Sequence, residues 1–360
     1  MTVPSFLVLT TLHPPDDTRI RERLIRSLEG LGEVTYATRD PGPSDTYGLI
    51  WHRLAGGRLT RNLRALGLVL VKKWDVVVIH DPETIPAGVI ARMIRRSRVV
   101  FDVHENLPAQ IASKEWIPDW AKPVSRGLAR TLYRLAERVL VLTLAEPGYR
   151  DLFRSVHPVF PNYPRSASFP DPDTLGDGSV VYVGDITRAR GIEDALEASA
   201  QAGVSLLAVG RVDDVLAGTL QARAEALGVD LELTGHLPNP VALQRVSVAS
   251  VGLSPLRDEP NYRFSLPTKT LEYLAMGVPV VATDLPGTRA VIGDLRSVAL
   301  VPPGDIPAMA RAISEALLPQ ARAEAVEQAP RVRRVFSWPE DAVRAFYSGL
   351  VNREGSPDPS

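Results

Sequence analysis

The chain has 360 residues, of which 45% are hydrophobic and 23% charged, a composition and length typical of a globular protein with two domains. Its lack of cysteine excludes disulfides, zinc–thiolate sites, iron–sulfur clusters and a cysteine nucleophile. The formal net charge of −1 hides an asymmetry, because residues 1–165 carry 24 basic and 17 acidic side chains whereas residues 166–360 carry 17 and 25.

Short apolar runs alternate with longer helical patterns in the first half of the chain. The N-terminal run SFLVLTT is short and has no basic residues before it, so we expect a first strand rather than a signal peptide. The later runs EVTYAT, DVVVIH, RVVFDVH and RVLVLT are continuous, as in parallel strands buried on both faces. This alternation predicts βαβ units in a doubly wound sheet. No run approaches the roughly 20 apolar residues of a membrane span.

Basic side chains are frequent in one part of this half. Arg58, Arg61, Arg64, Lys72 and Lys73 belong to one predicted helix, and Arg92, Arg95, Arg96 and Arg98 follow closely in the chain. They can be ordinary solvated helix faces, or a surface that contacts anionic lipid or an acidic acceptor. Nucleic acid is disfavoured, because no aromatic residues alternate with the basic ones.

The alternating pattern breaks once and then resumes. Residues 163–178 are dense in Pro, Ser, Asp and Gly, which predicts a linker. A second series of strands and helices, 179–335, predicts a second α/β domain. An amphipathic helix is expected at 336–352, and 353–360 should be a disordered tail.

Polar residues follow the predicted strands of the second half. Arg188 and Arg190 come after SVVYVG, Arg211 after VSLLAVG and His236 after VDLELTG. Because the carboxyl ends of parallel strands share one edge, these side chains should lie together. The segment SLPTKTLEY follows SVGLSPL and opens a helix near residue 268, whose free N–H groups suit an anion.

Lys269 and Glu272 lie one turn apart at this helix start. A lysine suits phosphate, and a glutamate accepts hydrogen bonds from ribose hydroxyls, so the pair predicts a nucleoside diphosphate site. The alternative is a surface ion pair worth less than about 0.5 kcal/mol. Their place among the other basic loops favours the nucleotide.

At these residues the sequence resembles the family 4 glycosyltransferases. SLPTKTLEYLAMGVPVVATDLPG, VYVGDITRARGIEDALEA and LTGHLPNPVALQRVSVASVGLSPL are similar to the family's donor domain. HPPDDTRIRERLIRSLEGLG, HDPE, FDVHEN with KEWIP after it, and NYP fit a bacterial branch with a PxKxxEY donor motif. The resemblance extends from about residue 6 to about residue 350.

The resemblance implies the α/β GT-B fold, with two Rossmann-like doubly wound domains that face each other across a cleft. Residues 1–162 would form the acceptor-side domain and residues 179–335 the donor domain, and the helix at 336–352 would cross back to the first domain. The implied activity is retaining, metal-independent transfer of a sugar from a nucleotide-diphosphate sugar, with UDP favoured, to an acceptor hydroxyl.

The family also implies the setting of this activity. No cofactor is expected, and the acceptor would be a glycan, a lipid-linked molecule or a small molecule in cell-surface or secondary-metabolite biosynthesis. The protein would be cytoplasmic, and peripheral contact of the basic N-terminal domain with the inner face of an anionic membrane is left open. Two alternatives remain: a non-catalytic nucleotide-sugar binding protein, and another GT-B-shaped enzyme such as a nucleotide-sugar epimerase.

The resemblance also implies roles for individual residues. The start of the helix at Thr268–Thr270 would hold the diphosphate, Arg190 the distal phosphate and Glu272 the ribose, while His104 would face the donor sugar. The full set comprises His104, Glu105, Arg190 and Lys269 for catalysis; Gly184, Arg188, Arg190, Arg211, His236, Leu237, Ser265, Thr268, Lys269, Thr270 and Glu272 for donor binding; and His13, Asp17 and His80 on the acceptor side.

Several of these residues allow a second interpretation. Phe264 stands where the family has a glutamate that touches the transferred sugar, and Asp185 stands where many members have arginine. His104 can be a structural histidine at a strand end, and Asp17 can simply cap the next helix. His80 belongs to the sequence HDPE, in which Pro82 suggests that the segment starts a helix.

Overall fold

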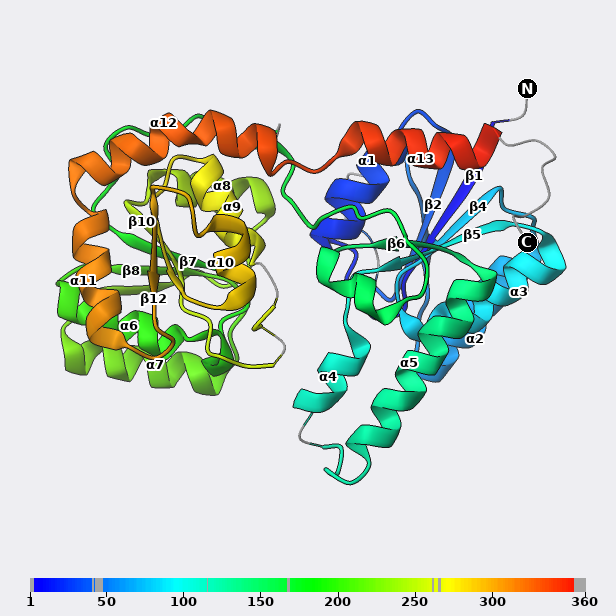
Figure 1. The fold of residues 1–360 in the computed structure, drawn as a ribbon, viewed down its shortest axis with the longest axis horizontal. Helices are drawn as coiled ribbons and strands as arrows, with labels where there is room; N and C mark the ends of the chain where they lie inside the picture. The colour runs from blue at the N-terminus through cyan, green and yellow to red at the C-terminus, as the bar shows by residue number, and fades with distance from the viewer. Residues whose placement is uncertain are drawn as a thin grey trace. The chain divides into compact units, whose positions relative to one another are not determined.

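The computed structural model describes residues 3–40, 42, 48–114, 116–166, 169–260, 262–264 and 267–352. The chain divides into two compact units. The first unit consists of Met1–Asn162 together with Trp338–Ser360, and the second of Tyr163–Ser337. Each unit is a six-stranded parallel sheet with helices on both faces (Figure 1).

The sheet of the first unit has the order β3-β2-β1-β4-β5-β6. Its strands are β1 (Ser5–Leu9), β2 (Glu33–Thr38), β3 (Ile50–Arg53), β4 (Val76–Ile79), β5 (Arg98–Val103) and β6 (Val141–Leu144). The central strands β1 and β4 are buried on both faces, which is why their sequences are continuously apolar. The winding direction reverses between these two strands, and ligands of such sheets bind beyond the carboxyl ends at that point.

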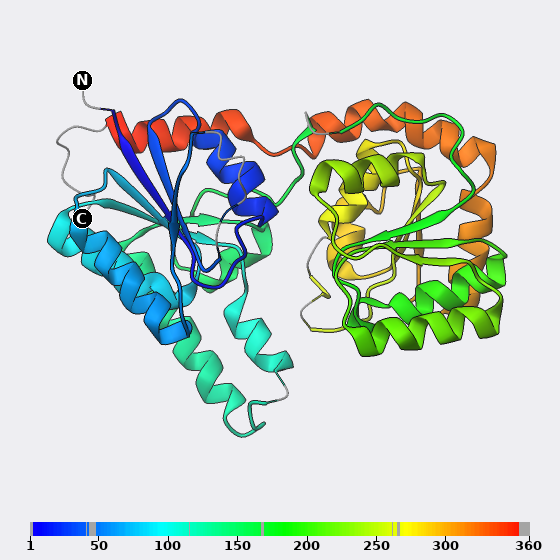
Figure 2. The ribbon, with the colours of Figure 1, turned by 180° about the vertical axis from the view of Figure 1, so that it is seen from behind.

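Helices cover both faces of this sheet (Figures 1 and 2). They are η1 (Thr18–Ile25), which continues as α1 (Arg26–Leu28), α2 (Arg58–Val71), η2 (Pro82–Thr84), α3 (Ile85–Arg95), α4 (Leu107–Ser113), α5 (Lys122–Val139), η3 (Pro147–Leu152) and α13 (Glu340–Asn352). Residues of α2, α3 and α5 form the core on one face, and residues of η1, α1 and α13 form the core on the other.

The second unit repeats this arrangement. Its sheet has the order β12-β11-β10-β7-β8-β9, built from β7 (Val180–Val183), β8 (Leu206–Val209), β9 (Leu231–Leu233), β10 (Val251–Ser254), β11 (Val280–Thr283) and β12 (Val298–Val301). Its helices are η5 (Arg188–Arg190), α6 (Ile192–Ala202), α7 (Asp214–Leu227), α8 (Asn239–Val248), α9 (Thr268–Ala275), α10 (Pro286–Ile292), α11 (Ile306–Ala316) and α12 (Pro319–Val335). The winding reverses between β7 and β10.

The prediction of two doubly wound α/β domains is confirmed. The assignment of Lys72 and Lys73 to the basic helix is wrong, because α2 ends at Val71 and Lys72 has an extended backbone. The ammonium of Lys72 lies 4.0 Å from the centroid of the Trp74 ring. The tail at 353–360 lies outside the described residues. Among the helices that the structure describes, none is long and apolar enough to cross a membrane.

Candidate functional sites

Two cations meet at the carboxyl edge of the second sheet, beside the strand pair where the winding reverses. Gly184, directly after β7, has a φ of +121°, and a Cβ atom there would lie 3.4 Å from Arg190 Nη1 and 3.7 Å from Lys269 Nζ. The glycine backbone therefore lies against both cations. Lys269 is the second residue of α9, the helix that follows β10. A protein edge with two adjacent positive groups is a site for an anion.

The side-chain nitrogen of Lys269 is buried and has no hydrogen-bond partner among the described residues. The side chain as a whole is only 8% exposed. Nζ lies 3.6 Å from the centroid of the Tyr182 ring, a cation–π contact. Burial and the neighbouring Arg190 hold the pKa of Lys269 well below its usual range. The interpretation of Lys269 as part of an exposed surface ion pair is therefore wrong.

Helix α9 begins at Thr268, as predicted, and its N-cap residue Pro267 offers no side-chain cap. The hydroxyl of Thr270 donates to the Pro267 carbonyl oxygen over 2.8 Å, which holds the turn before the helix. The first turn of α9 contains no acidic residue, so its positive end is available to an anion. Glu272 is half-buried one turn from Lys269.

The remaining residues predicted to bind the donor differ in their surroundings. Arg188 donates to Glu193 over 2.9 Å, and Arg211 and His236 are exposed after β8 and β9. Leu237 packs against the apolar core instead of facing solvent. Ser265 lies outside the described residues, and Phe264 is 71% exposed. Asp185 is exposed, with Oδ2 3.8 Å from Arg190 Nη2.

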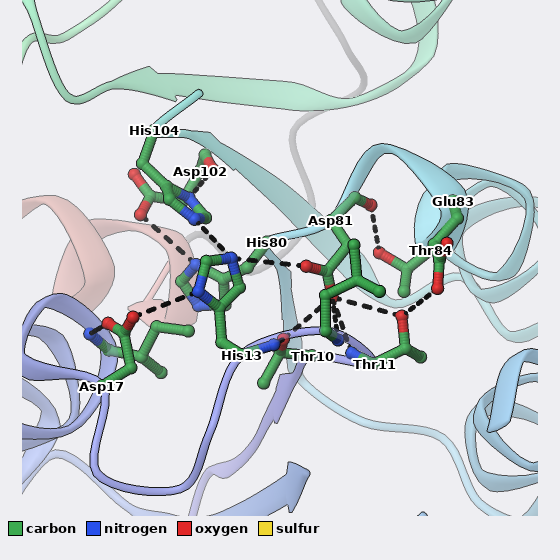
Figure 3. Close-up of polar contacts among 12 residues, drawn as sticks. Thr10, Thr11, His13, Asp17, His80, Asp81, Glu83, Thr84, Asp102 and His104 are labelled. Atoms are coloured by element: carbon green, nitrogen blue, oxygen red, sulfur yellow. Dashed lines mark hydrogen bonds and ion pairs between the residues drawn. The ribbon is translucent and has the colours of Figure 1, made fainter. Parts of the chain in front are cut away.

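In the first unit, polar side chains gather beyond β1, β4 and β5 (Figure 3). Asp81, after β4, accepts hydrogen bonds from Thr10 Oγ1 over 2.8 Å and from the Thr11 backbone N–H over 2.6 Å. These bonds fix the loop that leaves β1 and carries His13. Because the carboxylate of Asp81 is used here, it makes no side-chain cap for η2, although Pro82 stands at the first helical position as expected.

His13 links Asp17 to His104 (Figure 3). His13 Nδ1 lies 3.1 Å from Asp17 Oδ2, and His13 Nε2 lies 2.8 Å from His104 Nε2. His104 Nδ1 lies 3.1 Å from the Asp102 carbonyl oxygen, which can only accept, so this nitrogen is protonated. His13 Nδ1 faces the carboxylate of Asp17 and donates to it in the same way. One further proton then lies between the two Nε2 atoms, on His13 or on His104.

The electrostatics favour His13 over His104 as the ring that holds this proton. Burial by itself lowers the pKa of His13, but the hydrogen bond and charge of Asp17, with the charges of Asp81 and Glu105, raise it above its ordinary value. Burial and the neighbouring His13 and His80 lower the pKa of His104. The pKa of Asp17 is lowered in spite of burial, since His13 stabilises the carboxylate.

Asp17 caps the following helix and also binds His13, so both interpretations of this residue apply. Its Oδ1 accepts from the backbone N–H groups of Arg19 and Ile20 over 2.9 Å and 3.0 Å, so it caps η1, while Oδ2 holds His13. The cap fixes the carboxylate, and the carboxylate fixes the imidazole ring.

A buried ion pair supports the strand that carries His104. Arg19 donates to both carboxylate oxygens of Asp102 over 2.9 Å and 2.8 Å, and Thr143 donates to one of them over 2.9 Å. Burial raises the pKa of Asp102, but the charges and hydrogen bonds of Arg19 and His80 together outweigh it and hold this pKa well below its usual range. His80, 2% exposed, has Nδ1 3.4 Å from Asp102 Oδ2. His80 is therefore packed beneath His104, whose ring centroid lies 5.5 Å away.

Two groups of side chains in the described part of the first unit have the composition and spacing to hold a metal ion. One is His13, His104 and Glu105, and the other is His80, Asp102 and His104. In this structure His13 and His104 are hydrogen-bonded through their Nε2 atoms, and His104 Nδ1 is hydrogen-bonded to the Asp102 carbonyl oxygen. His80 Nδ1 lies 3.4 Å from a carboxylate oxygen of Asp102. The expectation that no metal takes part stays a prediction.

Sequence reasoning missed Glu146, which follows β6 at the same edge of the sheet. Burial raises the pKa of its carboxyl to about 7, and the charge of Arg19 opposes this shift. Tyr149, three residues later, has its hydroxyl 3.4 Å from the His104 carbonyl oxygen. The available signal was position alone, because Glu146 lies after a continuous apolar strand, as the predicted residues do.

Family models match both units. A glycosyl transferase 4-like domain matches residues 8–157, and a glycosyl transferases group 1 domain matches residues 177–318. The chain belongs to the family 4 glycosyltransferases. Together the two matches span most of the chain and include the carboxyl edge of each sheet. A comparison with curated proteins found none that matches this chain.

Solved structures are similar in fold to this chain at low sequence identity. Sucrose-phosphate synthase from Thermosynechococcus elongatus is 19% identical with a TM-score of 0.76, over 96% of this chain and 98% of that one. HepE from Anabaena, solved with UDP and glucose, is 15% identical with a TM-score of 0.73, over 98% and 100%. A TarM variant from S. aureus, solved with UDP and alpha-GlcNAc-glycerol, is 14% identical with a TM-score of 0.62, over 82% and 59%.

Proposed function

We propose that this glycosyltransferase moves a hexosyl or related sugar from a UDP-sugar to an acceptor hydroxyl with retention of the anomeric configuration. The observation that carries the proposal is the buried side-chain nitrogen of Lys269, which has no hydrogen-bond partner in the described chain and lies beside Arg190. Burying a charge is costly unless it is paired. A diphosphate at this edge would pair with both cations.

The residues of the second unit suit the leaving group. Negative charge builds on the diphosphate as the bond to the anomeric carbon breaks, and Arg190, Lys269 and the N-terminus of α9 would stabilise that charge. These fixed positive groups would take the place of a divalent metal. Glu272 would accept hydrogen bonds from the ribose hydroxyls, since a carboxylate accepts well and favours no phosphate. The choice of UDP rests on the family and on the UDP complexes of HepE and TarM.

The first unit would contribute the acceptor side. The carboxylate of Glu105 would accept hydrogen bonds from sugar hydroxyls at this strand edge, and the chain from Asp17 through His13 to His104 would hold the edge in place beside it. We infer that the acceptor is a glycan, a lipid-linked molecule or a small molecule, used in the cytoplasm for cell-surface or secondary-metabolite biosynthesis. Phe264 leaves the identity of the donor sugar open, since an apolar side chain replaces the glutamate expected there.

A donor panel tests this proposal. The protein is incubated with UDP-, GDP- and ADP-sugars, with and without simple glycoside acceptors, and release of the nucleoside diphosphate is followed. We expect release from UDP-sugars, unaffected by EDTA, and an anomeric configuration in the product that NMR shows to be that of the donor. Replacing Lys269 with Met should reduce release at least tenfold, whereas Arg331→Met, an exposed change on α12, should have no effect.

Other outcomes would favour the alternatives. Binding of the donor without transfer or slow hydrolysis would indicate a binding protein. Change of the sugar configuration with little transfer would indicate an epimerase. Loss of activity in EDTA, restored by a divalent cation, would contradict the metal-independent mechanism and draw attention to the cluster around His104.

A further inference from the structure

Two tryptophans stand out from the surface between α4 and α5. Trp116 is 76% exposed and Trp120 is 81% exposed, whereas Trp74 and Trp338 are buried. In both ribbon views, the turn between α4 and α5 projects beyond the sheet of its own unit (Figures 1 and 2). Large apolar side chains at a projecting tip suggest a surface that is covered by something other than this unit.

Helix α5 continues this surface with two rows of side chains. Val124, Leu128 and Leu135 are 62%, 66% and 51% exposed, and their spacing places them along one flank of the helix. The buried face, which contains Ala129, Tyr133 and Ala136, packs on the sheet side. Arginines at every fourth position line the other flank, and these are Arg126, Arg130, Arg134 and Arg138.

The projecting tip is held in place by its own packing. Ile111 of α4 and Ile117 of the turn form a small buried cluster with Ala129 of α5. Lys122 pairs with Asp119 over 2.8 Å, and the ammonium of Lys114 lies 5.6 Å from the centroid of the Trp116 ring. The turn is therefore folded while both indole rings remain outside its core.

We propose that the surface formed by Trp116, Trp120 and the exposed face of α5 docks on an anionic lipid bilayer. Indole rings favour the bilayer interface, and an apolar row on a basic helix lies well at the boundary between headgroups and acyl chains. The segment 114–139 contains six basic and three acidic side chains, so its charge complements an anionic surface.

This surface differs from the one that the basic sequence segments suggested. Arg58 is paired with Glu83, Arg64 donates to the Ala55 carbonyl oxygen over 2.6 Å, and Arg95 donates to the Leu70 carbonyl oxygen. Those arginines serve the fold of the first unit. By contrast, Arg130, Arg134 and Arg138 are exposed and make no hydrogen bond or ion pair with any residue that the structure describes. They remain available to lipid phosphates.

The surface is connected to the acceptor-side cluster by a short stretch of chain. Helix α4 starts at Leu107, three residues after His104, and Asn106 caps it by accepting from the Ala109 backbone N–H over 3.0 Å. If the proposed function holds, a bilayer at this surface favours a membrane-bound acceptor. The binding of the bilayer itself does not depend on that function.

Flotation with extruded vesicles tests the proposal on the full chain. We expect at least tenfold more protein to float with phosphatidylcholine vesicles that contain 40% phosphatidylglycerol than with phosphatidylcholine alone. Trp116→Ser with Trp120→Ser should reduce this binding at least tenfold. Arg130→Gln with Arg134→Gln should reduce it toward the level seen with neutral vesicles.

Matched changes on the second unit serve as controls. Leu175 and Val215 are 88% and 77% exposed there, and Arg331 and Arg334 are exposed on α12. Leu175→Ser with Val215→Ser, and Arg331→Gln with Arg334→Gln, should leave binding unchanged. Thermal unfolding and UDP binding of each variant show that it is folded. Brominated lipids should quench the tryptophan fluorescence of the wild type and not that of the Trp116→Ser, Trp120→Ser variant.

Three results would overturn the proposal. The first is absence of binding to either kind of vesicle, and the second is binding that the tryptophan changes leave intact. The third is a dimer in analytical sedimentation that those changes dissociate, because the surface would then bind a second copy of the chain. The same measurements distinguish bilayer docking from sugar transfer. Vesicle binding without sugar transfer contradicts only the proposed function, and sugar transfer without vesicle binding contradicts only the docking surface.

Discussion

Lys269 pays an electrostatic cost in the free protein that a bound diphosphate would relieve. Its side-chain nitrogen is buried, lies beside the cation of Arg190 and has no hydrogen-bond partner among the described residues. The same low-dielectric surroundings that disfavour this charge would strengthen its attraction to phosphate. The protonation of Lys269 should therefore report on whether an anion is bound.

Binding of UDP should be coupled to uptake of a proton by Lys269. Because the pKa of Lys269 is well below its usual range in the free protein and an anion favours the charged form, the affinity for UDP should fall as the pH rises. Calorimetric titrations in buffers with different ionisation enthalpies measure this uptake. Lys269→Met should abolish it and weaken binding at least tenfold. Identical heats in all buffers would show that Lys269 is already charged.

The role of Asp17 can be divided by two substitutions. Asp17→Asn keeps a good N-cap for η1 but removes the charge beside His13, so the pKa of His13 should fall. Asp17→Ala removes the cap as well and should cost roughly 1 kcal/mol more in the free energy of unfolding. Histidine titration by NMR and urea unfolding measure the two effects. An unchanged pKa of His13 in Asp17→Asn would contradict the proposed chain of hydrogen bonds.

Glu146 should make the first unit less stable at higher pH. Burial raises its pKa from an ordinary 4.5 to about 7, so the folded state holds the proton more tightly than the unfolded chain. The free energy of unfolding should then fall as the pH rises between these two values, by at most about 3 kcal/mol, and stay level above them.

Replacing Glu146 with Gln tests this dependence. Denaturant unfolding at pH 5 and pH 8 should show that Glu146→Gln stabilises the protein at pH 8 and has little effect at pH 5. Equal effects at both values would indicate that the carboxyl is solvated. Asp151, an exposed carboxylate in the following short helix, provides the control as Asp151→Asn.

At the scale of residues, the candidate site residues could be predicted from their position after a strand, whereas their burial and contacts could not. Lys269, Glu272, Arg190 and His104 could be selected because each follows a strand and the carboxyl ends of parallel strands share an edge. The burial of Lys269 could not be predicted, because it depends on Tyr182, which lies 87 positions earlier in the chain. The pairing of Arg19 with Asp102 is of the same kind, since it joins groups 83 residues apart that only the folded sheet brings together.

At the scale of elements, the loop between β7 and α6 depends on one glycine. Gly191 has a φ of +76°, and a Cβ atom there would lie 1.8 Å from the Pro255 carbonyl oxygen. That contact joins the loop after β7 to the loop after β10, the two loops that carry Arg190 and lead to Lys269. The left-handed conformation and the close approach both exclude other residues.

Gly191→Ala should therefore destabilise the second unit by more than about 2 kcal/mol and weaken UDP binding. Gly218 is the matched control, because it lies inside α7 with open space around it, and alanine there should stabilise the helix by up to about 1 kcal/mol. Chemical unfolding of both variants measures these opposite effects. A neutral Gly191→Ala would show that the two loops can separate without loss.

Most elements could be predicted because buried parallel strands are continuously apolar. β3 was missed since IWHR is a short edge strand with mostly exposed side chains, and its sequence lacks that pattern. The π-helical geometry of η1 was not predictable either. Asp17 marked where that helix begins, but the hydrogen-bond period inside it is decided by packing rather than by a local signal.

At the scale of the whole molecule, the same sheet order occurs twice, and the first sheet is completed by the end of the chain. Trp338, Val343 and Tyr347 are buried in the core of the first unit, and Trp338 Nε1 donates to Ser27 Oγ over 2.9 Å. The amphipathic pattern of the last helix predicted that it packs on something. Which core it joins came from the family resemblance and not from the pattern itself.

A chain that ends at residue 337 should lose the stability of the first unit and keep the second. It would leave the face of the sheet that contains Phe6 and Val8 without its Trp338 and Tyr347 partners, and removing aromatic side chains from a core typically costs 3–5 kcal/mol each. Hydrogen exchange should show lost protection in residues 3–162 while UDP binding persists. Protection that survives in both units would show that α13 is dispensable.

The discontinuous first unit also sets an order of events during synthesis. The second unit is made from one uninterrupted segment, 163–337, so all of its contacts are available once that segment has left the ribosome. The first unit begins earlier but cannot complete its core until the last helix, Glu340–Asn352, has been translated. The N-terminal half of this enzyme is thus translated first and completed last, and until then its apolar sheet face stays exposed, as in folding intermediates that are prone to aggregation.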